Sequence, residues 1–229
     1  MMWWDQGFYV FVIPAMIFAM WAQAKVRSAY NTYSRLRSQS GRTAVEVAAA
    51  LLRNSGLGDV RIEKQRGQLT DHYDPRSRTL RLSDSTYDSP SVAAIAIAAH
   101  EVGHAVQHSV GYAPLALRNG LVPVAQFTSQ AAFPLFFIGL FMNSGFLMDL
   151  GLLFFLGAVL FQAITLPVEF NASKRALDML QVSGYVAPSE VVPVGNMLNA
   201  AALTYVAGMA VAVAQLLRLL VLRGGRRRD

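Results

Sequence analysis

The chain has 229 residues, of which 54% are hydrophobic and only 15% are charged, against about a quarter charged in ordinary soluble domains. The apolar residues gather in a few long runs, which indicates an integral membrane protein and excludes a purely soluble one. Cysteine is absent, which excludes disulfides and thiolate metal sites, so any metal ligand must be His, Asp or Glu.

The net charge of +6 does not indicate a nucleic-acid-binding protein. The basic residues lie beside the apolar runs, between Lys25 and Arg37 after the first run and between Arg223 and Arg228 after the last. Basic residues in these positions are typical of the flanks of membrane spans. The sequence contains no nucleic-acid-binding motif. We therefore expect a lipid bilayer, and no nucleic acid, as partner.

Four apolar runs are long enough to compete for the membrane. The first covers residues 8 to 24 and predicts a retained anchor helix. The second (about 117 to 142) and third (about 146 to 168) are separated by Asn143, Ser144 and Gly145, which predict a tight turn and an antiparallel helical hairpin. The fourth covers about 200 to 222. Whether it spans fully is left open, because its basic tail would then end outside, so we expect three or four spans.

A polar segment between the first and second runs has the pattern of a small α+β region. Apolar spacing predicts a helix over residues 42–54, which Gly56 ends. Two short strands are expected, one near residues 60–62 and one over 79–83, with residues 72–75 forming the turn between them. A further helix is expected from Ser91 to about Val110. The fold class is therefore mainly α, an integral membrane helical protein with a small soluble-side α+β region that includes a short β-hairpin.

These elements divide the chain into five parts. They are a membrane anchor helix (1–24), a polar region on the cytosolic side (25–116), a transmembrane helical hairpin (117–169), a soluble-side helical segment (170–199), and a C-terminal membrane helix with a basic tail (200–229). The amino-terminal stub and the 143–145 turn carry no Lys or Arg, whereas residues 25–118 and 170–199 carry many. We therefore expect a multi-pass protein of the cell membrane whose polar region faces the cytoplasm.

The helix that begins at Ser91 carries the sequence His100-Glu101-Val102-Gly103-His104. Residues four apart share one face of a helix and rise about 6 Å between them, so His100 and His104 can bind one metal ion. Glu101 is rotated away from that pair but lies within one turn of it, where it can act as a general base on a water molecule. This is the HExxH pattern of zinc peptidases, in which one rigid helix supplies two ligands and the base.

A catalytic zinc ion usually has three protein ligands. Glu169 is a candidate because it is the first charged residue after the third apolar run. The alternative is that Glu169 only ends a membrane helix and pairs with Lys174 or Arg175, and the pattern leaves both open. His108 lies about 12 Å along the helix from His100, too far to join the same ion, so we expect it to face solvent or to support a ligand.

Three segments resemble those of a known family. Residues 100–107 (HEVGHAVQ), residues 166–176 (LPVEFNASKRA) and the segment from 73 to 83 are similar to the membrane-bound neutral zinc metallopeptidases of the YugP type. The resemblance covers nearly the whole chain. It implies Zn²⁺ as cofactor, a gluzincin-like ligand set of His100, His104 and Glu169, and hydrolysis of peptide bonds in a peptide or membrane-protein substrate.

Residues after Glu169 are candidates for supporting roles. Ser173 lies on the same helical face as Glu169, and Asn171 is close by, so either could form a hydrogen bond with a metal ligand. Arg175 is expected to stabilise charge in the reaction, to bind a substrate carboxylate, or only to pair with lipid phosphate or an acidic group. Strand 79–83 is expected either to offer an edge to an extended peptide or only to cover the active-site helix.

The sequence thus predicts a membrane-embedded zinc-dependent endopeptidase of the zincin type, with Glu101 as catalytic base. The alternative is a zinc-binding membrane scaffold or regulator without proteolytic activity. Glu101 argues against the alternative, because a structural metal site needs no activating base. The sequence predicts no particular oligomeric state and no cleavage specificity.

Overall fold

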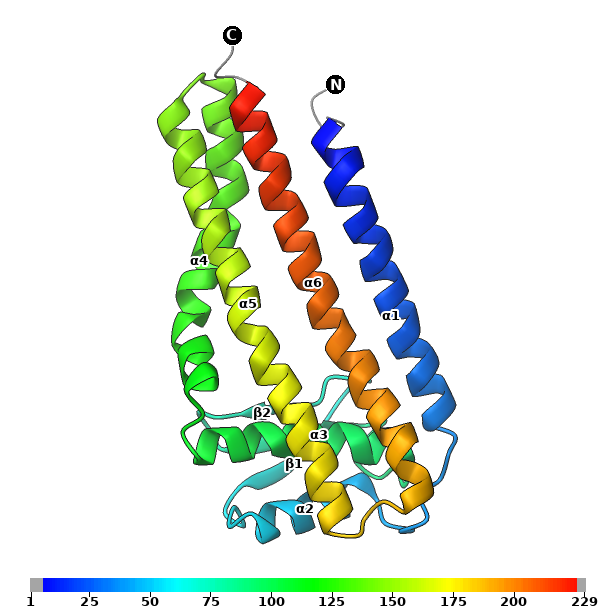
Figure 1. Ribbon diagram of the computed structural model, residues 1–229. Coiled ribbons are helices and arrows are strands. Elements are labelled where there is room, and N and C mark those ends of the chain that lie inside the picture. The colour runs from blue at the N-terminus through cyan, green and yellow to red at the C-terminus, as the bar shows by residue number, and fades with distance from the viewer. Residues whose placement is uncertain (1–5, 226–229) are drawn as a thin grey trace. The chain divides into compact units, whose positions relative to one another are not determined.

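The computed structural model describes residues 6–225 (Figure 1). Within this range the chain divides into two compact units. Residues 6–23, 117–167 and 204–225 form the first, which we call the helical unit. Residues 24–116 and 168–203 form the second, which we call the mixed unit.

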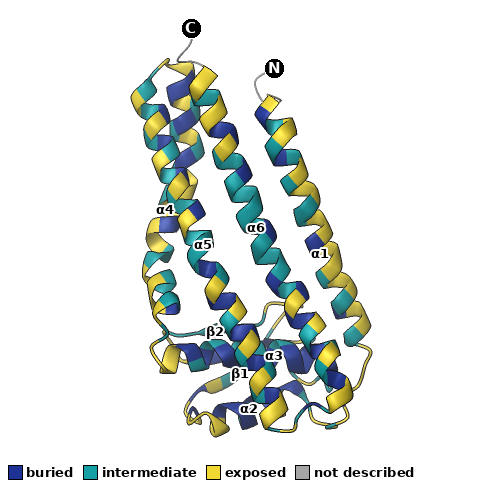
Figure 2. Ribbon diagram, viewed as in Figure 1, coloured by how far each residue is buried: buried dark blue, intermediate teal, exposed yellow. Residues whose placement is uncertain are grey.

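The helical unit draws on four long helices. They are α1 (Ile13–Tyr33), preceded by the π-helical turn η1 (Phe8–Val12), then α4 (Ala113–Phe141), α5 (Gly145–Val182) and α6 (Val191–Gly225). All four are long and apolar enough to cross a membrane, so the higher of the two expected span counts is confirmed for the described part of the chain. Large apolar side chains are exposed along these helices (Figure 2), among them Phe127, Phe141, Leu153 and Leu160. Such surfaces are suited to lipid.

The expected hairpin joins α4 to α5. Asn143 has the left-handed φ of 55° that the tight turn requires. A Cβ atom built on Gly139 would lie 2.6 Å from the backbone nitrogen of Met148, and one on Gly151 would lie 2.6 Å from that of Phe136. The two helices therefore pack closely because glycine occupies these positions, as small residues do between membrane helices.

The mixed unit begins with α2 (Ala44–Asn54), which confirms the helix expected over residues 42–54. Its amino terminus is a capping box. The Thr43 amide donates to the Glu46 carboxylate (2.8 Å), and the Thr43 hydroxyl oxygen accepts from the Glu46 amide (3.5 Å). These bonds satisfy backbone donors that have no partner inside the helix. The buried face of α2 packs on α3 in one hydrophobic core.

A three-stranded sheet follows, made of β1 (Arg61–Gln65), β2 (His72–Asp74) and β3 (Thr79–Ser83). The strand order is β1-β3-β2, with β3 parallel to β1 and antiparallel to β2. The predicted turn at residues 72–75 is wrong, because Tyr73 pairs with Leu80 in the sheet. The reversal comes after Asp74, whose carboxylate accepts the Arg76 amide (2.9 Å), a bond that favours a turn over a continued strand.

The position of β3 also corrects an expectation. Strand 79–83 is paired on both sides, so it offers no free edge to a peptide, and the edge strands are β1 and β2. The reason is the additional strand β2, which occupies the side of β3 that the sequence left open. Thr79, Leu80, Leu82 and Ser83 are buried, as expected of a central strand.

Helix α3 (Val92–Ser109) carries the HExxH pattern. The Ser91 hydroxyl caps it by accepting the Ala94 amide (3.2 Å). Residues 92–99 are buried except for the partly buried Ile97, and Figure 2 shows α3 as largely buried. This helix is therefore the central element of the mixed unit's core, which also includes residues of α2, β3, α5 and α6.

Candidate metal centre

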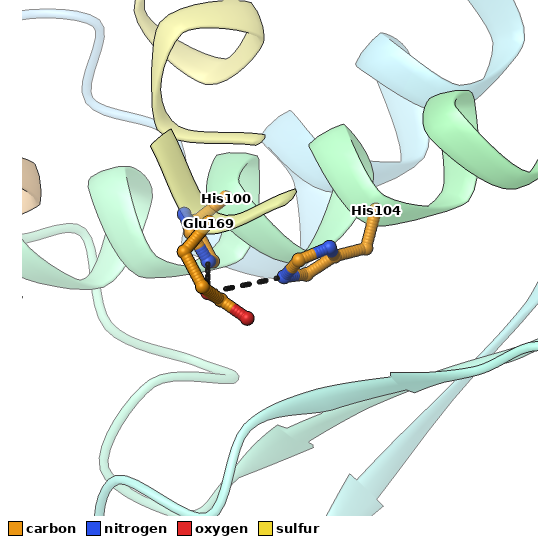
Figure 3. A group of neighbouring side chains, drawn as sticks. All are labelled: His100, His104 and Glu169. Atoms are coloured by element: carbon orange, nitrogen blue, oxygen red, sulfur yellow. Dashed lines mark hydrogen bonds and ion pairs between the residues drawn. The ribbon is translucent and has the colours of Figure 1, made fainter. Parts of the chain in front are cut away.

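Three side chains from two helices meet in the mixed unit (Figure 3). His100 and His104 project from α3, and Glu169 projects from the part of α5 that follows Pro167. The Oε2 atom of Glu169 lies 3.3 Å from Nε2 of His100 and 3.6 Å from Nε2 of His104. Their side chains are 14%, 13% and 2% exposed, in the order His100, His104 and Glu169. The structure thus brings together the two histidines and the glutamate that the sequence suggested.

This group has the donor chemistry of a zinc site. Its ligand atoms, two imidazole nitrogens and one carboxylate oxygen, all lie within 4.8 Å of one another. Zinc in catalytic sites binds imidazole nitrogen and carboxylate oxygen, and it commonly takes three protein ligands. Both Nε2 atoms face the same carboxylate oxygen, so one ion can reach all three side chains. The residues present therefore fit the metal.

The two helices approach closely beside this group. A Cβ atom built on Gly103 would lie 2.6 Å from the backbone oxygen of Ala172, a separation that side chains do not reach. Gly103 therefore allows the backbone of α3 to touch that of α5, one helical turn from Glu169. The glycine between the two histidines thus has a structural reason that the sequence alone did not reveal.

Glu101 lies on α3 beside the histidine pair and is partly buried. Its Oε2 atom accepts the backbone amide of Tyr73 in β2 (3.0 Å). Burial raises the pKa of the Glu101 carboxyl above its ordinary value, although charge on His104 and His100 opposes this. A glutamate with a raised pKa is better matched to accepting and releasing a proton near neutral pH. Tyr73 was not singled out from the sequence, because nothing in its spacing places its amide at Glu101.

Ser173 and Asn171, two of the three candidate supporting residues, lie in α5 close to the metal centre. The Ser173 hydroxyl lies 3.1 Å from Nδ1 of His100. Asn171 lies one turn away from a metal ligand, and its Oδ1 atom accepts a hydrogen bond from Nε of Arg175 (2.8 Å). Arg175 is therefore partnered by Asn171 rather than by an acidic side chain in the hydrogen bonds that the structure shows.

Gln107 contacts a metal ligand but was missed in the sequence. It is fully buried, and its Oε1 atom lies 3.0 Å from Nδ1 of His104. Its Nε2 atom donates to the Val168 carbonyl (2.8 Å) and to Oδ1 of Asn171 (3.0 Å). The available signal was its position three residues after His104, which places both on one side of the helix.

His108 lies outside the metal centre, as expected. It is exposed, and its Nδ1 atom lies 2.9 Å from the hydroxyl of Tyr73. Tyr73 therefore contacts α3 twice, through its amide at Glu101 and through its hydroxyl at His108. These contacts hold the edge strand β2 beside the active-site helix.

Comparison with known proteins agrees with this geometry. Residues 8–224 match the model of the family described as "Putative neutral zinc metallopeptidase". The chain is similar to a protein of Bacillus subtilis (strain 168) named "Putative membrane protease YugP", with 46% identity over 215 residues, which are 94% of this chain and 96% of the relative. No solved structure shows significant similarity to the chain.

Proposed function

Because this chain belongs to the neutral zinc metallopeptidase family, we propose that it is a membrane-embedded, zinc-dependent endopeptidase. The observation that carries the proposal is the convergence of His100, His104 and Glu169, with Glu101 beside them on the same helix. His100, His104 and Glu169 are the zinc ligands, a gluzincin-like set. Three ligands leave a position at the metal for water or substrate.

The chemistry divides between the metal and Glu101. Bound zinc lowers the pKa of water to about 7 and polarises the scissile carbonyl. Glu101 takes a proton from the attacking water on its carboxylate and then passes it to the nitrogen of the leaving amine. The Tyr73 amide, 3.0 Å from Oε2 of Glu101, holds the carboxylate in place during both transfers. His100 and His104 stay neutral so that their Nε2 atoms remain ligands.

The substrate is a peptide or a membrane protein, cleaved at the cytoplasmic face of the cell membrane. Four helices suited to spanning a bilayer keep the enzyme in the membrane. The side follows from charge, because Lys and Arg are concentrated in residues 25–118 and 170–199 and absent from the turn at 143–145. A cysteine placed in β1, for example Lys64→Cys, tests this: it should react with a membrane-impermeant thiol reagent only after the cells are opened.

Zinc content and hydrolysis of a quenched peptide should be measured together on the purified protein and on Glu101→Gln. We expect one zinc ion per chain in both, and a loss of about 10²–10⁴-fold in hydrolysis in the variant. A matched control is Glu63→Gln, because Glu63 lies on β1 with its side chain half exposed and should leave both readings unchanged.

Each result has a distinct meaning. Full hydrolysis by Glu101→Gln would show that another group is the base. Zinc in the wild type with no cleavage of peptides or membrane-protein substrates by either protein favours the alternative function, a zinc-binding scaffold or regulator. An absence of zinc from the wild-type protein would remove the basis of both functions.

A further inference from the structure

The side chain of Gln107 links one metal ligand to helix α5. It is 0% exposed, so each of its polar atoms needs a partner inside the protein. Its two ends have different partners. The Oε1 end meets Nδ1 of His104, and the Nε2 end meets two oxygens, those of the Val168 backbone and the Asn171 side chain. These contacts account for the amide oxygen and for both protons of the amide nitrogen.

The direction of these hydrogen bonds is fixed by Arg175. A guanidinium group can only donate, so the Asn171 oxygen, 2.8 Å from Nε of Arg175, must be the acceptor. The same oxygen then accepts the proton of Gln107 Nε2. The Val168 carbonyl, which can only accept, requires the same orientation of the Gln107 amide. Two independent contacts thus turn the Gln107 oxygen toward His104.

We propose that Gln107 is a positioning residue that locks His104 in the tautomer able to bind zinc. An oxygen that can only accept, 3.0 Å from Nδ1, requires the imidazole proton to be on Nδ1. The unprotonated nitrogen is then Nε2, the atom that faces Glu169 at 3.6 Å. The inference rests on the proposed function, because it concerns how a zinc ligand is held. It goes further in assigning Gln107, Asn171 and Arg175 one shared role.

His100 has a different kind of partner. Its Nδ1 atom lies 3.1 Å from the Ser173 hydroxyl, which can either donate or accept. Ser173 can therefore bond both tautomers of His100 and fixes neither. The structure thus assigns the two histidines unequal preparation: His104 is set before the metal arrives, and His100 adopts its ligand tautomer as the metal binds. Ser173→Ala should consequently weaken zinc binding less than a change at Gln107.

The test is the zinc affinity of the purified protein, measured by competition with a chromophoric chelator. Gln107→Met keeps the length of the side chain but removes both hydrogen-bonding groups, and we expect a 10–100-fold loss of affinity, as other partners of metal-ligating histidines show. Gln107→Glu keeps an acceptor for Nδ1 and should stay within a few-fold of the wild type. Equal affinity of Gln107→Met and wild type would overturn the proposal. So would an equal loss in Gln107→Glu, which would make the role one of packing.

A second readout reports the tautomer directly. With ¹⁵N-labelled histidine, the ring nitrogen shifts of the metal-free protein distinguish a protonated Nδ1 from a protonated Nε2, and only four histidines need assignment. We expect His104 to carry its proton on Nδ1 in the wild type and in Gln107→Glu, and to be mixed in Gln107→Met. A proton on Nε2 in the wild type would contradict the inference even if zinc binds. Failure of the wild type to bind zinc would instead count against the proposed function.

Discussion

A Cβ atom on Gly103 would lie 2.6 Å from the backbone oxygen of Ala172. These two residues mark the point where α3 and α5 touch, and the ligands lie on either side of it. His104 follows Gly103 directly, and Glu169 precedes Ala172 by three residues. The distance between the two backbones therefore sets whether Glu169 reaches the histidines.

Replacing Gly103 by alanine should weaken the metal centre. The added methyl group would meet backbone rather than a flexible side chain, so the helices must move apart and carry Glu169 away from His104. We expect at least a 10-fold loss of zinc affinity and a stability loss of about 1–3 kcal/mol, measured by chelator competition and thermal unfolding. The control is Gly195→Ala in α6, where a Cβ atom meets nothing within 4 Å. This variant should bind zinc normally and be slightly stabilised. Normal zinc binding by Gly103→Ala would contradict the close contact.

Removal of zinc should destabilise the wild-type protein. The ion joins α3 to α5 through three side chains, and a ligand that binds only the folded state stabilises it by about 2.7 kcal/mol at a free concentration of 100 Kd. A chelator should therefore lower the unfolding temperature of the wild type. The double variant His100→Ala/His104→Ala should show no such response. An equal shift in the double variant would mean that the chelator acts elsewhere.

The buried carboxylate of Glu190 should be important for stability but not for catalysis. It accepts the backbone amides of Gln39 and Ala187 (2.8 Å each) and lies 3.5 Å from the Ser38 hydroxyl. Glu190→Gln turns one acceptor into a donor that faces a donor, so we expect a loss of about 1–3 kcal/mol. Denaturant unfolding with excess chelator separates this effect from the metal's. Zinc affinity of the remaining folded protein should be unchanged, and an unaltered unfolding midpoint would disprove the bracing role.

Asp74 should make stability depend on pH in the acid range. Hydrogen bonds from the Ser77 hydroxyl and the Arg76 amide, and then the Arg81 guanidinium, lower the pKa of Asp74 from 3.8 to about 2. Because the folded state lowers the pKa, the stabilisation is complete above about pH 4 and is lost as the pH falls toward 2. Unfolding of wild type and Asp74→Asn should be compared at several pH values with chelator present. Their difference should shrink from pH 4 to 2, and a constant difference would contradict this.

The sequence predicted those parts of the protein in which one local pattern decides. Long apolar runs predicted the helices α1, α4, α5 and α6, and the glycine and asparagine at residues 143–145 predicted the turn between α4 and α5. The HExxH spacing placed His100 and His104 on one helical face, where the structure has them. These features need only the period of a helix and the chemistry of the residues.

The errors and omissions concern contacts between distant segments. Residues 72–74 have turn-like composition, yet pairing of Tyr73 with Leu80 makes them a strand, because sheet contacts override local preference. Gln107 and the Tyr73 amide reach the metal centre only through the packing of α3 against α5 and β2. The approach of Glu169 was suggested by resemblance rather than by spacing, since it depends on the backbone contact at Gly103.

The distance along the chain between His100 and Glu169, 69 residues, has a consequence for biosynthesis. The histidines are translated first, then the two apolar helices of the hairpin, and only afterwards Glu169. At a synthesis rate of about 5–20 residues per second, the nascent chain carries an unfinished metal centre for several seconds while the hairpin enters the bilayer. The order of the segments thus delays completion of the centre until most of the protein has been made, and so it protects the ribosome's other products from premature cleavage.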